Sequence, residues 1–360
     1  MFSLTPKLAA DYEILMKKIL ISFPGHGESK LFNPEARDAV LHPFIYLRDR
    51  LKEHGYNLMT ADDHSVEGCA WVWFWDTLSV DIPSYGLRSV VRTIKHAMFG
   101  SKPAQGARQL YQECVRAGLR DRAVLFTGEP PAIIPRNWDP RVHKLFSIIF
   151  TWNDSYVDGK KFHKFCWPLT GQFPEIEEVP FHSRKLLVNI SGNKFSTHPR
   201  ELYTARRQTI KYFEQHHPND FDLYGVRWNS DGIHQDFYKS YRGAPKHKWD
   251  VYPYYRFGVC YENMRDEPGW ITEKIFDCMR AGVVPIYWGA PNITDFVDEG
   301  TFIDRRNFKS DAELADFLLS VTEKDYAHYK HAIQHYLHSD KFAMFLPPAF
   351  AQNIIRVLSL

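Results

Sequence analysis

The stretch from Gly269 to Gly289, GWITEKIFDCMRAGVVPIYWG, contains a helix pattern followed by a strand pattern. Apolar residues three and four apart after Lys274 predict one buried helix face, with Thr272 as N-cap and Gly282 just past the end. The run VVPIYWG then predicts a short buried strand. Lys274 stands in the first helical turn, where a cation faces the positive end of the helix dipole. We therefore expect an anion at this helix N-terminus, unless Lys274 simply extends into water.

Helix and strand patterns alternate on both sides of this stretch. Strands are expected at 18–23, 56–62, 69–76, 122–128, 145–152, 185–191, 221–226, 255–263, 283–289 and 300–306, and helices at 44–55, 107–119, 201–218, 311–322 and 327–339. Such alternation predicts parallel sheets with helical crossovers, an α/β fold. A polar, proline-containing segment at 171–184 interrupts the pattern and is interpreted as a linker.

The linker divides the chain into two expected Rossmann-like, parallel-sheet domains that face each other across a cleft. We place the first domain at residues 1–172, the second at 185–335, and a helical segment that returns to the first domain at 336–360. Doubly wound sheets bind ligands at the carboxyl ends of their strands, so both sheets would direct those ends into the cleft. Neither GxGxxG nor GxxxxGK[ST] occurs, which argues against dinucleotide oxidoreductases and P-loop proteins.

Composition restricts the class of partner. The chain has 360 residues with 45 basic and 43 acidic side chains, a net charge of +2, so nucleic acid is not expected as a partner. Five cysteines without CxxC or zinc-site spacing favour a reducing compartment. The charged N-terminus predicts neither a signal peptide nor an integral membrane segment. We expect a cytoplasmic protein, and leave open a peripheral position at the inner membrane and the oligomeric state.

Cations gather at one end of the second predicted sheet. Arg206 and Arg207 lie on the helix at 201–218, and Lys274 opens the helix of the quoted stretch. Cations at a helix N-terminus would hold a diphosphate and stabilise a pyrophosphate leaving group in place of Mg²⁺. Glu273 would accept hydrogen bonds from ribose hydroxyls, or would simply complement the helix dipole.

A longer segment carries a family resemblance. Residues 257–297, FGVCYENMRDEPGWITEKIFDCMRAGVVPIYWGAPNITDFV, resemble the signature of the α1,3/4-fucosyltransferases, glycosyltransferase family 10, with its E-N, T-E-K and P-[IV]-x-x-G-x-P anchors. Residues 202–228 and 122–131 are similar to other segments of that family, whereas the first 100 residues match only in architecture. The resemblance implies a GT-B fold, a GDP-fucose donor bound by the second domain, an acceptor bound by the first, and inversion at the anomeric carbon.

The resemblance also assigns donor-site residues by position. Lys274 would hold the diphosphate and Glu273 the ribose. The family's phosphate-binding arginine would be Arg206 or Arg207, and we favour Arg206. Three further positions would belong to the donor site: Glu262, Asn263 and Trp270.

Glu129 takes the position of the family's catalytic base. Inverting transfer from an already activated donor needs one base to accept the proton of the acceptor hydroxyl. Glu129 follows a predicted strand at the carboxyl end of the first sheet, although a carboxylate there is equally typical of an exposed loop. Contacts to the acceptor are assigned more weakly, to His26, Trp73 and Trp75, because aromatic strand residues are more often buried and loop histidines more often solvated.

These features together predict an α1,3-fucosyltransferase, a hexosyltransferase of EC class 2.4.1, that moves L-fucose from GDP-fucose to a hydroxyl of N-acetylglucosamine or glucose in a protein-linked glycan or a lipopolysaccharide. No metal or other cofactor is expected. The alternatives are a transferase of another nucleotide sugar on the same fold, and a non-catalytic protein that binds carbohydrate or nucleotide. The membrane anchor of animal members and the basic heptad tail of some bacterial members are missing from this sequence, which favours a bacterial-type cytoplasmic enzyme.

Overall fold

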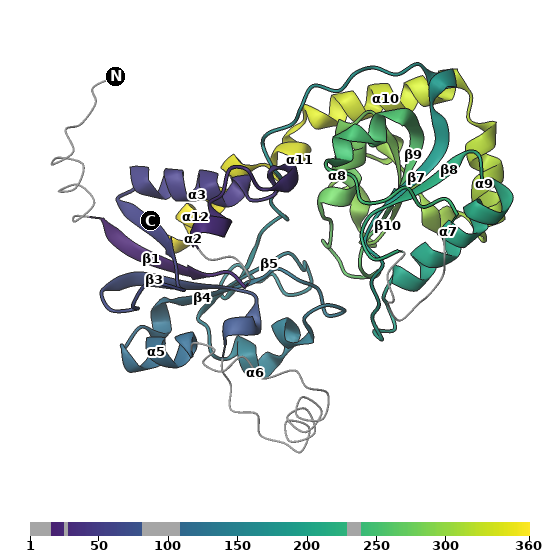
Figure 1. Cartoon of the computed structure of the whole chain (residues 1–360). Helices are drawn as coiled ribbons and strands as arrows, with labels where there is room; N and C mark the ends of the chain where they lie inside the picture. Colours follow the sequence, from purple (N-terminus) through teal and green to yellow (C-terminus); the bar gives the residue numbers. More distant parts are fainter. Residues whose placement is uncertain (1–15, 25–27, 81–108, 229–238) are drawn as a thin grey trace, which may run out of the picture.

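The computed structural model describes residues 16–24, 28–80, 109–228 and 239–360, and these form two lobes, each built on a parallel sheet (Figure 1). His26 lies outside the described residues. The N-terminal sheet has the strand order β2-β1-β3-β4-β5-β6. Its strands are β1 (Lys17–Ser22), β2 (Tyr56–Thr60), β3 (Cys69–Trp75), β4 (Ala123–Thr127), β5 (Ile148–Thr151) and β6 (Phe162–Lys164).

Helices cover both faces of the N-terminal sheet, so its strands are apolar on both sides. In β3 the tryptophans Trp71, Trp73 and Trp75 face one hydrophobic cluster, and Val72 and Phe74 face the other. Helices on the two faces are visible in Figure 1, α3 with α12 on one face and α5 with α6 on the other. Their bounds are α2 (Glu28–Leu31), α3 (His42–Glu53), α5 (Leu110–Arg116), α6 (Pro140–His143) and α12 (Pro347–Leu358).

The C-terminal sheet repeats the same order with five strands, β11-β10-β9-β7-β8. The strands are β7 (Lys185–Ile190), β8 (Phe221–Tyr224), β9 (Tyr255–Tyr261), β10 (Val284–Trp288) and β11 (Ile303–Asp304), and the helices are α7 (Tyr203–His216), α8 (Glu273–Arg280), α9 (Asp311–Ser320), α10 (Glu323–Leu337) and α11 (Asp340–Ala343). In both sheets the second strand lies outside the first, so the order reverses between β1 and β3 and between β7 and β9. Doubly wound sheets bind ligands at such switch points.

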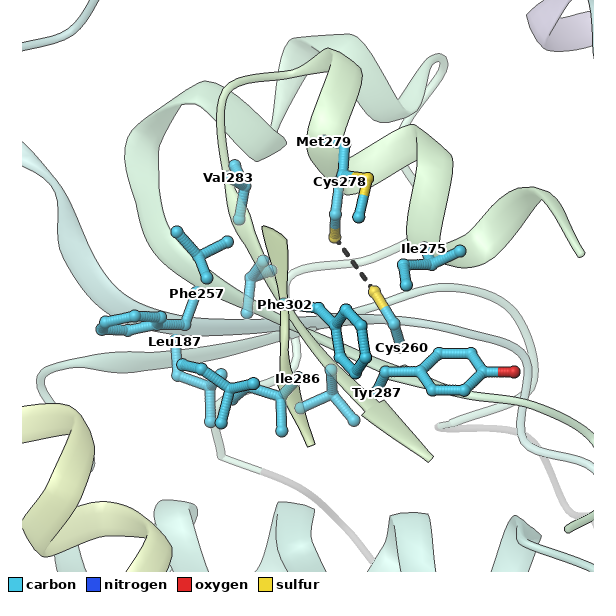
Figure 2. Close-up of a cluster of buried hydrophobic side chains, with 14 of the residues drawn as sticks. Leu187, Phe257, Cys260, Ile275, Cys278, Met279, Val283, Ile286, Tyr287 and Phe302 are labelled. Atoms are coloured by element: carbon cyan, nitrogen blue, oxygen red, sulfur yellow. Dashed lines mark hydrogen bonds between the residues drawn. The ribbon is translucent and has the colours of Figure 1, made fainter. Parts of the chain in front are cut away.

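Apolar packing fixes the position of α8, the helix of the quoted stretch. Figure 2 shows Ile275, Cys278 and Met279 of α8 directed at the β9 residues Phe257 and Cys260. The thiols of Cys260 and Cys278 lie 3.2 Å apart as a hydrogen-bonded pair of free cysteines. Because this helix face is fully buried, the N-terminus of α8 is held at the carboxyl ends of β9 and β7.

The end of the chain packs on the N-terminal lobe. Helix α12 lies against α3, with the rings of Phe350 and Phe44 5.9 Å apart, and Figure 1 shows the C-terminus in that lobe. This helix falls within the helical segment predicted at 336–360, whereas the sequence pattern gave no signal for the three-residue strand β6. No helix within the described ranges is long and apolar enough to cross a membrane.

Candidate active site

Two cavities lie at the carboxyl ends of the sheets and share part of their walls. The first, which we call the basic cavity, has a volume of about 280 Å³ and is lined by residues that follow β7 and β9 and by the start of α8. The second, the apolar cavity, has a volume of about 460 Å³ and includes residues that follow β1, β3 and β4. Each cavity therefore lies at the switch point of one sheet. Four residues line both: Glu129, Trp167, Lys248 and Glu273.

Lys274 lines the basic cavity and is held by groups of the protein itself. Its Nζ donates to Glu262 Oε2 at 3.0 Å and to Thr272 Oγ1 at 2.7 Å. Thr272 is the N-cap residue, but its hydroxyl donates to Glu262 instead of capping the helix. A buried carboxylate therefore already offsets the unfavourable position of Lys274 at the helix N-terminus, which corrects the expectation that only water or a bound anion does so.

Glu262 has a different role from the one its position in the motif suggested. Its side chain is 0% exposed, and its two oxygens accept from the backbone N–H and hydroxyl of Thr272 and from Lys274. It has no surface on which to contact a nucleotide sugar. Its assignment to the donor site is therefore wrong as a direct contact, and Glu262 is a positioning residue for Lys274.

Glu273 stands between two lysines in the wall common to both cavities. Burial alone would raise its pKa, but Lys274 and Lys248 outweigh burial and lower the pKa to about 2. Lys248 donates to Asp277 at 2.5 Å; burial opposes its charge, yet Asp277 and Glu273 raise its pKa above the usual value. Both charges thus persist at neutral pH. Sequence reasoning missed Lys248, because nothing local to it indicates that it meets α8.

The two adjacent arginines of α7 point to different places. Arg206 is 4% exposed, lines the basic cavity, and donates through Nη2 to the carbonyl oxygens of Tyr261 and Glu262 at 2.5 and 3.2 Å. Among the described residues no carboxylate lies within salt-bridge distance of it, and burial lowers its pKa. Arg207 donates instead to the carbonyl oxygen of Lys194 at 2.7 Å. A buried guanidinium without a paired anion favours Arg206 as the anion-binding residue.

A loop after β7 supplies a part of the basic cavity that sequence reasoning missed. Ser191, Gly192 and Lys194 line it. Gly225 has φ +128°, and a Cβ there would lie 1.9 Å from the carbonyl oxygen of Ser191, so only glycine lets the end of β8 approach this loop. The signal in the sequence was the Ser-Gly-Asn-Lys run directly after a strand.

Asn263 and Trp270 also line the basic cavity, as expected from the motif. Trp270 is almost fully buried and packs on Trp152 and Trp167 of the other lobe, with ring centroids 4.6 and 5.5 Å apart. Its Nε1–H has no hydrogen-bond acceptor among the described residues. Trp270 therefore joins the two lobes and leaves one buried donor for a ligand or water.

The loop before Trp270 fastens the lobes together. Glu267 is buried, accepts from Asn153 Nδ2 at 2.8 Å and pairs with Arg200 at 2.5 Å, so it forms an interlobe contact. Gly269 has φ +81°, and a Cβ there would lie 2.3 Å from the carbonyl oxygen of Trp152. Close approach of the two backbones thus requires glycine.

Glu129 lies at the junction of the two cavities with its backbone fixed. Its N–H donates to Asp76 Oδ1 at 2.9 Å, and its carbonyl oxygen accepts from Asn137 Nδ2 and Trp138 Nε1 at 3.0 and 3.2 Å. No described residue donates to its carboxylate. Burial, and then the charge of Asp76, raise the pKa of Glu129 to about 7. A carboxyl group on a fixed backbone, free of hydrogen bonds from described residues and with a pKa near neutrality, is suited to accept a proton.

The two tryptophans that were weakly assigned to the acceptor lie in different places. Trp75 lines the apolar cavity, 4% exposed. Trp73 is 0% exposed and packs on Phe126 within the N-terminal core, so its assignment as an acceptor contact is wrong. The strand alternation of β3 places both on one face, and only the residue at the strand end reaches the cavity.

Comparisons with known proteins show what the C-terminal lobe resembles in sequence. Residues 185–344 match the family model described as glycosyltransferase family 10 (fucosyltransferase), C-terminal. The chain is 33% identical over 73 residues to alpha-(1,3)-fucosyltransferase FucT of Helicobacter pylori and 42% identical over 65 residues to alpha-(1,4)-fucosyltransferase of Arabidopsis thaliana. These stretches cover 20% and 18% of this chain, and only 15% and 16% of the relatives' length.

Solved structures extend the likeness to the whole chain. A crystal structure of an alpha1,3-fucosyltransferase aligns over 100% of this chain and 93% of its own, with a TM-score of 0.53 and 12% identity. A crystal structure of an alpha1,3-fucosyltransferase with GDP-fucose aligns over 96% of this chain and 91% of its own, with a TM-score of 0.50 and 13% identity. At this identity the likeness concerns the fold, which is the expected GT-B arrangement of two parallel-sheet domains. Residues 185–344 therefore resemble the C-terminal part of the fucosyltransferases of glycosyltransferase family 10, and the described residues of the chain have the GT-B fold.

Proposed function

We propose that this chain transfers L-fucose from GDP-fucose to a hydroxyl of an N-acetylglucosamine or glucose residue in a glycan, with inversion at the anomeric carbon. The observation that carries the proposal is the junction of the two cavities. The basic cavity, with Arg206 and Lys274, opens beside Glu129, a carboxyl group that no described residue uses structurally.

The basic cavity suits a nucleoside diphosphate. Its described lining has four cations, Lys194, Arg206, Lys248 and Lys274, against the carboxylates of Glu129 and Glu273. Arg206 and Lys274 would hold the diphosphate and stabilise the charge on the departing GDP. Ionised Glu273 would accept hydrogen bonds from the ribose hydroxyls, and Trp270 Nε1–H would donate to the nucleotide sugar. The donor is inferred from the resemblance of residues 185–344 to fucosyltransferases.

The proposed reaction balances with one base. The acceptor hydroxyl oxygen attacks the anomeric carbon of fucose from the face opposite GDP, and the bond from that carbon to the β-phosphate oxygen breaks. The electron pair leaves on GDP, beside Arg206 and Lys274, and the hydroxyl proton moves to Glu129. Asp76 and Asn137 would keep the Glu129 backbone in place during this step.

Metal independence stays a prediction. The described residues contain no group of three or more His, Cys, Asp or Glu side chains arranged to hold a metal ion. The expectation rests on the cations of the basic cavity, which would take over the charge stabilisation that Mg²⁺ gives in other transferases.

The test combines donor binding and turnover. GDP should protect the protein from thermal unfolding in the presence of EDTA, far better than UDP or ADP at equal concentration, by mass action on the folded state. With an array of glycan acceptors, GDP-fucose should give fucosylated products by mass spectrometry, whereas GDP-mannose and UDP-glucose should not. Turnover only with another donor would support the alternative transferase, and GDP binding without turnover on any acceptor would support a non-catalytic binding protein.

A further inference from the structure

The apolar cavity is larger than the basic cavity and differs from it in chemistry. It has a volume of about 460 Å³, and most of its described lining is aliphatic or aromatic. Glu129 and Glu273 mark the end where it meets the basic cavity. If the sugar that receives fucose sits beside Glu129, most of this cavity must be filled by another part of the same acceptor.

The aromatic wall of the cavity is held in one arrangement. Trp75 stacks on Phe23 with ring centroids 5.3 Å apart, and Phe44 meets both rings edge-on at 4.9 Å. Phe44 and Trp75 are each only 4% exposed, so their rings are fixed by the core behind them. A preformed apolar surface binds apolar groups without a cost for ordering its own side chains.

Apolar lining continues to the protein surface. Val40 and Leu78 belong to the lining, and they are 51% and 62% exposed. Exposed aliphatic side chains that continue a buried aromatic wall indicate contact with a partner that is itself apolar. The side chains of Val40 and Leu78 offer no hydrogen-bonding group to the hydroxyls of a further sugar.

The charges of the apolar cavity exclude anions. Its described lining carries five carboxyl groups, Asp38, Asp76, Glu129, Glu273 and Asp277, against the single ammonium group of Lys248, which Asp277 already neutralises. A carboxylate, sulfate or phosphate placed here would meet like charges. The occupant should therefore be uncharged.

We propose that the acceptor is an uncharged glycoside with an apolar aglycone, an alkyl or aryl group, which occupies the apolar cavity while its sugar faces Glu129. This inference rests on the proposed function for the identity of the donor. The binding part of the inference is independent of the proposed function, because an apolar glycoside would enter the cavity whether or not transfer follows.

The experiment compares matched acceptors. Methyl, octyl and 8-carboxyoctyl β-N-acetylglucosaminides are tested as acceptors with GDP-fucose, and their binding to the GDP-loaded protein is measured by calorimetry. We expect the octyl glycoside to have a KM and a Kd at least about tenfold below those of the methyl glycoside, since seven more methylenes are buried. The carboxylate should cancel most of that gain. Equal values for methyl and octyl, or undiminished binding of the carboxyoctyl glycoside, would overturn the inference.

Variants of the exposed lining residues test whether the preference for the octyl glycoside arises in the apolar cavity. The double variant Val40→Asp/Leu78→Asp should lose the preference for octyl while its use of the methyl glycoside changes little, because both side chains are exposed and their replacement leaves the core intact. Val115→Asp, at a position on α5 that is 43% exposed and lines neither cavity, should keep the preference. Loss of the preference in both variants would contradict this location. If octyl binding depends on Val40 and Leu78 but no donor gives product, the cavity assignment holds and the proposed transfer fails.

Discussion

The basic and apolar cavities share four residues but differ in how they are built. The basic cavity takes most of its charges from segments that follow β7 and β9, and from α7 and α8. The apolar cavity collects residues that follow β1, β3 and β4, together with residues of α3, the linker and α8. Most residues of the basic cavity come from short sequence motifs in one lobe. The apolar cavity, by contrast, forms only when the two lobes pack together.

The largest expected effect lies where the cavities join. Glu129→Gln keeps size and hydrogen bonding but cannot accept a proton at neutral pH. Transfer to acceptor should fall by roughly 10²–10⁴, the usual contribution of a positioned base. GDP protection against heat should stay unchanged, because we propose that the diphosphate binds among the cations of the other domain. Glu175→Gln, in the exposed linker, is the matched control. Transfer within a few-fold of wild type would exclude Glu129 as the base and direct attention to Asp76.

A second prediction compares the two adjacent arginines of α7, of which only Arg206 lines the basic cavity. Arg206→Met should raise the Kd for GDP by roughly 10–100-fold, because a charge-assisted hydrogen bond contributes about 1.5–3 kcal/mol. Arg207→Met should leave that Kd within about threefold, since Arg207 is directed at the carbonyl of Lys194. Calorimetric titration with GDP measures both, with the unfolding temperature of each apo variant as a folding check. The reverse ranking would move the anion site to Arg207.

Variants of Lys274 test whether its charge is compensated by the protein or by a bound ligand. Lys274→Met should lower the free energy of unfolding of the apo protein by about 2 kcal/mol. This loss is smaller than the roughly 3–5 kcal/mol lost when one partner of a fully buried ion pair is removed, because the Lys274 side chain is 24% exposed. The double variant with Glu262→Gln should recover part of the loss, since no buried carboxylate is then left unpaired. Denaturant unfolding of both variants and of Glu262→Gln completes the cycle. An apo Lys274→Met protein as stable as wild type would show that Glu262 is not its structural partner.

The smallest effect concerns pH. Folding raises the pKa of Glu129 from about 4.5 to about 7, mainly by burial, so between these pH values the folded state binds more protons than the unfolded state. The contribution of Glu129 to stability therefore falls as pH rises through this window. Glu129→Gln should unfold roughly 4 °C above wild type at pH 8, and at nearly the same temperature as wild type at pH 4, below the unfolded pKa. Wild-type kcat/KM should rise with pH through about 7, as the base ionises. A flat stability difference from pH 5 to pH 8 would mean that Glu129 titrates normally.

The contrast between the cavities also explains what the sequence predicted. The alternation of strands and helices predicted both sheets, and the motif around Lys274 predicted the basic cavity, because each depends on residues close in the chain. Lys248 and Glu267 could not be placed, since their partners Asp277 and Asn153 lie 29 and 114 residues away. Trp73 and Trp75 share a face by strand alternation, so only the position of the strand end distinguishes the buried ring from the one that lines a cavity.

The central claim is that the two cavities hold donor and acceptor on either side of Glu129. A crystal structure of the Glu129→Gln variant with GDP-fucose and the octyl glycoside tests it most directly. We predict the diphosphate on Arg206 and Lys274, the octyl chain along Trp75, and the acceptor hydroxyl within about 2.6–3.2 Å of the side chain at position 129. A diphosphate bound away from Arg206 and Lys274, or an acceptor hydroxyl directed at Asp76, would contradict the account.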